Sequence, residues 1–274
     1  MKLEMNRAWN DALRLLGVSR DVILVVAGVF FFLPYFAFMA LAPDPLTGLA
    51  GGRTASGEAM AARLGEFYGQ LWWAILLIVI LQAIGMLGLI ALLTDRRRPT
   101  VSEALKIGAR RMLTYIAAYL LLGLALGVLF VILASLAALS GVAAFGALAL
   151  LAVFVAWVFL FVRFSLVAPI LVKEPIANPL AALGRSWVLT HGNGGRLFGF
   201  FFLLFVTYLV VMMVVSMVLG TLFGLFGQSV AHFGDALLMS LLNAAWVTLF
   251  LAVLSAVHDQ FAGLSPRMPS QAFE

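Results

Sequence analysis

Six long apolar runs constrain the fold of this chain more than any motif in it. Each run has at least the roughly 20 residues that a helix needs to cross the hydrocarbon core of a bilayer. Hydrophobic residues make up 64% of the 274 positions and charged residues only 11%, a balance outside the range of soluble domains. Backbone groups in lipid must be hydrogen-bonded within their own segment, so the runs are predicted to be helices. The predicted spans cover residues 22–41, 67–93, 112–139, 142–172, 197–226 and 236–257.

A short phrase of small, leucine and basic residues recurs three times, at residues 11–14, 103–106 and 181–185. Two apolar runs follow each copy, which indicates an internal repeat. The chain is therefore predicted to be a single all-α integral membrane domain with six transmembrane helices. Its three parallel repeats each contain an amphipathic elbow helix and a transmembrane hairpin. The units cover about residues 1–93, 94–172 and 173–262, and a short cytoplasmic tail covers residues 263–274.

The distribution of Lys and Arg predicts the orientation. Fifteen of the 17 basic residues fall in the N-terminal segment, the second and fourth connections and the tail, and only Arg53 and Arg63 fall on the other side. Cytoplasmic segments carry the excess of positive charge, so both termini are predicted to be cytoplasmic. The net charge of +5 then reflects topology and affinity for anionic headgroups, with no nucleic acid required. The chain has no cysteine, which excludes disulfides and thiolate metal sites.

The three predicted elbow helices carry aromatic and basic residues that suit the membrane interface. In the first, an apolar face includes Trp9 and a basic face includes Arg14; the second carries Lys106 and Arg110, and the third carries Trp187. Such a pattern is typical of helices that lie in the headgroup region. We predict these five residues to be interfacial anchors. A purely orienting role for the elbows and a role in gathering phospholipid headgroups both fit the pattern.

Local signals predict several helix boundaries. Thr100 and Glu103 have the spacing of a capping box, and Asn178 precedes a proline at a first helical position, which suits an N-cap. Proline lacks the backbone N–H and disrupts helices. We therefore expect Pro34 to kink the first span, and Pro169 to end the regular helix of the fourth run.

Arg163 is a basic residue inside an apolar run, nine positions before that run ends. An arginine at mid-bilayer is costly, whereas one near the boundary can extend its charged end to the interface. The sequence therefore predicts that Arg163 lies near the cytoplasmic boundary. One hypothesis is that Arg163, Arg185 and Arg196 together hold an anionic lipid headgroup. The alternative is that Arg163 is an anchor whose charge is satisfied by Glu174 or by backbone groups.

Ser229, His232 and Asp235 lie within seven residues and resemble the composition of a catalytic triad. Triads are defined by converging geometry, which three residues on one short turn seldom achieve. We interpret Asp235 as the N-cap of the sixth helix. No catalytic residue and no metal ligand is predicted.

Residues 163–169 (RFSLVAP), Glu174, residues 182–193 (ALGRSWVLTHGN) and residues 196–197 form a recognisable phrase. This phrase resembles the bacterial glycerophosphoryl diester phosphodiesterase membrane-domain family, and the six-span layout is similar from end to end. In some members the membrane region precedes a catalytic barrel, which takes roughly 250 residues. The resemblance implies the membrane part alone, located in the bacterial inner membrane and associated with phospholipid chemistry that another protein performs.

These observations predict a non-enzymatic inner-membrane protein that interacts with lipid or serves as a scaffold in phospholipid and envelope metabolism. Its predicted partners are membrane phospholipids and an unidentified membrane or cytoplasmic protein, with no nucleic acid and no cofactor. The alternative is a permease for a lipid-like or small amphiphilic solute, with a wet cavity bordered by Gln82 or Asn243. An intramembrane hydrolase is a third, less favoured class.

Overall fold

The computed structural model describes residues 2–18, 20–42, 57–94 and 99–263. Within these ranges the chain is helical with no strand, and six segments are long and apolar enough to cross a membrane. The predicted all-α, six-span class is therefore confirmed. The six segments are Arg20–Leu41, Met60–Thr94, Val101–Ser140, Ala144–Lys173, Gly194–Gly224 and Gln228–Phe261.

The first span is irregular close to Pro34. Helix α1 (Met5–Val18) precedes it, and the span itself contains α2 (Arg20–Ala27), the π-helical segment η1 (Gly28–Phe32) and α3 (Leu33–Leu41). The N–H of Leu33 donates to the carbonyl of Gly28, five residues earlier. A π-helical turn is one of the recognised causes of a helix kink. The irregularity expected from Pro34 is thus present, one turn ahead of the proline.

The second and third spans form a tightly packed pair, α4 (Gly57–Thr94) and α5 (Val101–Ser140). The predicted capping box begins α5, because the Glu103 N–H donates to the Thr100 side chain and the Thr100 N–H donates to the Glu103 carboxylate. The elbow predicted for the second unit is therefore the first part of α5, continuous with the span. A Cβ atom on Gly108 would overlap the carbonyl oxygen of Ile84, so glycine is needed for this helix contact.

The fourth run consists of two helices, α6 (Ala143–Phe164) and α7 (Val167–Lys173). The prediction that Pro169 ends the regular helix was wrong in position, because the break lies at Ser165 and Leu166 and Pro169 sits inside α7. A proline ring clashes with the carbonyl four residues before it, which here belongs to Ser165. The proline therefore disrupts the helix one turn upstream.

The last unit contains α8 (Pro179–Thr190), α9 (Gly194–Gly224) and α10 (Gln228–Phe261). Asn178 is the N-cap of α8 as predicted, with its Oδ1 accepting hydrogen bonds from Leu180 N and Ala181 N. The prediction for Asp235 was wrong, because α10 begins at Gln228 with Gly227 as its N-cap residue. Gly227 has a φ of 102°, which starts α10 two turns earlier than the charge pattern suggested.

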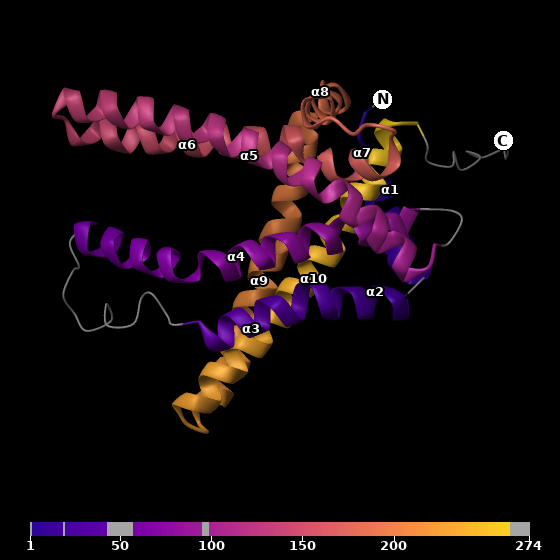
Figure 1. The fold of residues 1–274 in the computed structure, drawn as a ribbon, viewed down its shortest axis with the longest axis horizontal. Coiled ribbons are helices and arrows are strands. Elements are labelled where there is room, and N and C mark those ends of the chain that lie inside the picture. The colour runs from indigo at the N-terminus through magenta and orange to yellow at the C-terminus, as the bar shows by residue number, and fades with distance from the viewer. Residues whose placement is uncertain (1, 19, 43–56, 95–98, 264–274) are drawn as a thin grey trace.

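The hairpins pack at one end of the molecule and separate toward the other. Helices α1, α7 and α8 and the C-terminal end of α10 gather at one end, and the α5–α6 hairpin projects away from it (Figure 1). In the most apolar window of each span, 39% of the residues of α4 and α10 are buried, against 6% in α5, α6 and α9. Helices α4 and α10 are therefore central, and lipid must cover most of the other three.

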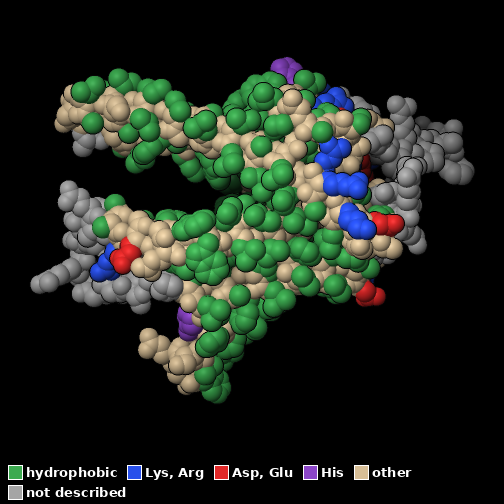
Figure 2. Space-filling model, in the orientation of Figure 1, with side chains coloured by type: hydrophobic (Ala, Val, Ile, Leu, Met, Phe, Trp, Pro, Cys, Tyr) green, Lys and Arg blue, Asp and Glu red, His purple; other side chains and the backbone are tan. Residues whose placement is uncertain are grey.

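Charge follows the same division. Lys and Arg side chains gather over the end where the short helices lie, apolar side chains cover the projecting helices, and an open gap separates the α5–α6 hairpin from α4 (Figure 2). This distribution agrees with an apolar region bordered by a basic end. The arrangement in three repeats and the assignment of the basic end to the cytoplasm stay predictions.

Candidate functional site

Arg163 lies in the last turn of α6, at the basic end of the molecule. Its guanidinium is placed between two aromatic rings, with Cζ 5.4 Å from the ring centroid of Phe159 and 4.8 Å from that of Trp187. Contacts of this kind are worth about 0.5–2 kcal/mol each, depending on desolvation. The two rings come from α6 and α8, so the side chain is fixed in one orientation where these helices meet.

Two donors of this guanidinium lack an acceptor. Nε and Nη1 of Arg163 are buried and have no hydrogen-bond partner within the described residues. The backbone carbonyl of Arg163 is satisfied, since Ser186 Oγ and Thr190 Oγ1 donate to it at 2.8 and 3.3 Å. A buried donor without a partner costs about 1–3 kcal/mol, and more when it is charged. The site therefore calls for an acceptor, preferably an anionic one.

The N-terminus of α9 lies beside the same guanidinium. A Cβ atom on Gly194, the first residue of α9, would be 3.8 Å from Arg163 Cζ. The Asn193 side chain does not cap this helix, so the first-turn N–H groups of Gly194, Gly195 and Arg196 point outward without a side-chain cap. A helix N-terminus carries partial positive charge and is suited to bind phosphate or carboxylate. Both groups at this site are positive, and one bound anion would satisfy both.

The three arginines of the headgroup hypothesis are placed differently. Arg163 and the first turn of α9, which contains the exposed Arg196, lie at the same site. Arg185 instead donates from Nε to Glu174 Oε2 at 2.9 Å. Its charge is therefore compensated within the protein. Glu174, which the alternative interpretation paired with Arg163, is the partner of Arg185.

Glu174 belongs to a larger ionic network at the end of α10. Its Oε1 lies 3.1 Å from Nε2 of His258, a fully buried residue. Lys173 Nζ donates to Asp259 Oδ1 at 2.9 Å and to the carbonyl of Ser255 at 3.0 Å. Paired buried charges of this kind fix the relative position of the elements that carry them. The network therefore ties α7 and α8 to α10.

Sequence reasoning missed His258 and Asp259. Both follow the last apolar run directly, and Lys173 and Glu174 follow the fourth run in the same way. Two spans that end on the same side of the membrane bring such residues to one depth. Opposite charges at the ends of these two runs were thus a usable signal for an ionic contact between them.

The predicted anchors are found in two environments. Arg14, Lys106, Arg110 and Trp187 are exposed, and Arg14 Nη2 pairs with Asp11 Oδ1 at 2.8 Å. Trp9 is half-buried and packs against the hydrophobic core. The apolar face of α1 is therefore partly covered by protein, and Trp187 has a second contact through Arg163.

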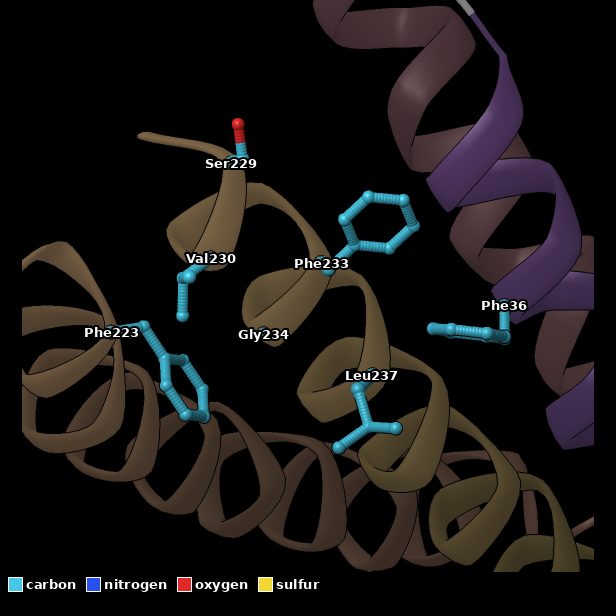
Figure 3. A pocket seen from close by; sticks show the side chains of 7 residues that line it. All are labelled: Phe36, Phe223, Ser229, Val230, Phe233, Gly234 and Leu237. Atoms are coloured by element: carbon cyan, nitrogen blue, oxygen red, sulfur yellow. The ribbon is translucent and has the colours of Figure 1, made fainter. Parts of the chain in front are cut away.

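Two open grooves lie away from Arg163. The first, of about 420 Å³, is lined by Phe36 of α3, Phe223 of α9 and the first turns of α10, including Ser229, Phe233 and Leu237 (Figure 3). Its side chains are almost all apolar, which suits lipid contact and gives no support to hydrolysis at Ser229.

The second groove, of about 640 Å³, lies where η1, α4 and α5 meet. It is lined by Phe30, Ile84 and the start of α5, including Lys106. Neither groove includes Gln82 or Asn243. The wet cavity that a permease would need at these two residues is therefore not one of these grooves.

Comparisons with protein-family models, curated proteins and solved structures give no match for this chain. The class of protein that fold and composition define is a polytopic α-helical membrane protein. The resemblance to the glycerophosphoryl diester phosphodiesterase membrane-domain family stays a prediction from residues 163–197.

Proposed function

We propose that this chain is a non-enzymatic, lipid-interacting membrane protein that binds the phosphate of a phospholipid between Arg163 and the N-terminus of α9. The observation that carries the proposal is the pair of buried guanidinium N–H groups without an acceptor, next to a helix start without a side-chain cap. A phosphate diester offers oxygens to both sets of donors and neutralises the charge that they share.

The surroundings of the site favour a lipid over a free phosphate ion. Phe159, Phe198 and Phe202 expose about half of their side chains on α6 and α9, on the way from Arg163 into the apolar region. Acyl chains attached to the bound phosphate would cover such surfaces. The exposed Trp187 suits the boundary between headgroups and acyl chains.

A scaffold role agrees with the rest of the molecule. The ionic network and the packed ends of α4 and α10 form a rigid basic end, while α5, α6 and α9 are covered by lipid. We place this end in the cytoplasm because it carries most of the Lys and Arg residues, and the membrane is then the bacterial inner membrane. The protein would hold phospholipid at the inner leaflet for a membrane or cytoplasmic partner in phospholipid metabolism.

Native mass spectrometry of the purified protein in detergent tests this function. Anionic phospholipid, supplied as phosphatidylglycerol, is expected to remain bound to the wild type. Arg163→Met keeps most of the side-chain length and removes the charge, and it is expected to lower retention at least ten-fold. Arg14→Met removes an exposed arginine of the same end and is expected to leave retention unchanged. Equal retention by the two variants would contradict the proposal.

One observation favours the alternative class, a permease. Asn243 Nδ2 and Thr248 Oγ1 on α10 are buried without a hydrogen-bond partner within the described residues, and water in a solute path could satisfy them. Flux of a fluorescent short-chain phospholipid or a small amphiphile across proteoliposomes separates the two classes. The lipid-binding scaffold predicts no flux above protein-free liposomes, and a permease predicts flux that Asn243→Leu abolishes.

A further inference from the structure

Two consecutive helices begin after an asparagine, and the two side chains are used differently. Asn178 precedes α8, and its Oδ1 accepts from Leu180 N at 2.9 Å and from Ala181 N at 3.4 Å. Asn193 precedes α9 in the same position but makes no cap hydrogen bond. Asparagine is among the strongest N-cap residues, and a cap stabilises a helix start by about 1 kcal/mol. A specific contact must therefore divert the side chain of Asn193.

That contact comes from the start of the chain. The backbone N–H of Leu3 donates to Asn193 Oδ1 at 3.1 Å, and both residues are buried. The neighbouring Glu4 exchanges two hydrogen bonds with Gln260 near the end of α10: Glu4 N donates to Gln260 Oε1 at 3.3 Å, and Gln260 Nε2 donates to the Glu4 carbonyl at 3.2 Å. The segment before α1 is thus docked on the turn between α8 and α9 and on α10.

We propose that the docked N-terminal segment holds the phosphate site open by keeping Asn193 Oδ1 away from the first-turn N–H groups of α9. When the segment leaves, Asn193 caps α9 as Asn178 caps α8, and its oxygen occupies donors that a phosphate would use. This regulation rests on the proposed function. It makes phospholipid binding at Arg163 depend on contacts of residues 3 and 4, which are distant in sequence from the site.

A single substitution removes the diverting contact. Leu3→Pro eliminates the N–H that donates to Asn193, because proline has none. A ligand must then displace a cap worth about a factor of five in binding, since 1.4 kcal/mol corresponds to ten-fold. The dissociation constant for short-chain phosphatidylglycerol in detergent is expected to rise about five-fold. Gln260→Leu releases Glu4 instead and is expected to act in the same direction, which provides a second variant if Leu3→Pro folds poorly.

The control is the same substitution in a chain that cannot form the new cap. Asn193→Ala is expected to bind phosphatidylglycerol as the wild type does, and adding Leu3→Pro to it is expected to change nothing further. Asn178→Ala removes the cap of α8 and is expected to leave the effect of Leu3→Pro intact. A five-fold loss that persists in the Asn193→Ala background would overturn the proposal, as would wild-type affinity in both Leu3→Pro and Gln260→Leu.

Hydrogen–deuterium exchange reports the cap without lipid. The amides of Gly195 and Arg196 are expected to exchange more slowly in Leu3→Pro than in the wild type, because the Asn193 oxygen protects one of them. Unchanged exchange there overturns the switch even where Arg163→Met still abolishes lipid binding. If Arg163→Met binds like the wild type, the proposed function itself fails, and slower exchange in Leu3→Pro would then show a cap change unconnected with lipid.

Discussion

Replacing Glu174 with glutamine tests the ionic network that holds α7 and α8 against α10. The carboxylate is 2.9 Å from Arg185 Nε and 3.1 Å from His258 Nε2, and its side chain is 18% exposed. Glu174→Gln keeps the shape of the side chain and removes its charge. Arg185 then loses its anionic partner in a half-buried position, and one side-chain oxygen becomes an amide donor.

The expected cost follows from these contacts. Removing one member of a buried ion pair costs about 3–5 kcal/mol, whereas an exposed pair contributes about 0–1 kcal/mol. Arg185 is 38% exposed and His258 is fully buried, which places Glu174 between these limits, at about 2 kcal/mol. For domains of 150–250 residues, each kcal/mol shifts Tm by about 2–4 °C. The expected decrease in Tm is thus about 4–8 °C.

A thermal melt of the detergent-purified protein, followed by tryptophan fluorescence, measures this shift. Asp11→Asn is the matched control, since the Asp11–Arg14 pair has the similar length of 2.8 Å but Arg14 is 62% exposed. It is expected to lower Tm by less than about 2 °C. Equal shifts for the two variants, or no shift for Glu174→Gln, would refute the view that this network stabilises the basic end.

Three further predictions follow. Gly108→Leu is expected to prevent the packing of α5 on α4 and to abolish a monodisperse peak in size-exclusion chromatography, because its side chain would overlap the Ile84 carbonyl. Thr100→Val removes the capping oxygen of α5 and is expected to cost about 1 kcal/mol, measured as a fall in Tm of a few degrees. In this cysteine-free chain, Lys106→Cys is expected to react with an impermeant maleimide from the cytoplasmic side and Arg63→Cys from the opposite side; labelling of both from one side would contradict the topology.

The parts of the fold that sequence predicted correctly depend on local chemistry. The capping box at Thr100 and the cap at Asn178 involve residues at most three apart, and the six spans follow from apolar length alone. Pro169 was assigned the correct effect in the wrong place, because its ring acts on the carbonyl of Ser165. The start of α10 was misplaced at Asp235, since a charged side chain outweighed the weaker signal from Gly227.

The candidate site was only half predictable. A positive charge within an apolar run drew attention to Arg163, and nothing in the neighbouring sequence indicates that Trp187 would stack on it. The assignment of Arg185 to Glu174 depends on the turn between α7 and α8. The diversion of Asn193 depends on Leu3, 190 residues away, and no local pattern encodes a contact of that range.

Direct observation of the phosphate is the most decisive measurement. A cryo-electron microscopy structure in nanodiscs that contain phosphatidylglycerol would show whether a headgroup occupies the site. We expect density for a phosphate within about 3 Å of Arg163 Nε or Nη1 and of the first-turn N–H groups of α9. A guanidinium paired with a protein carboxylate, together with a first turn of α9 that binds no headgroup, would contradict the account.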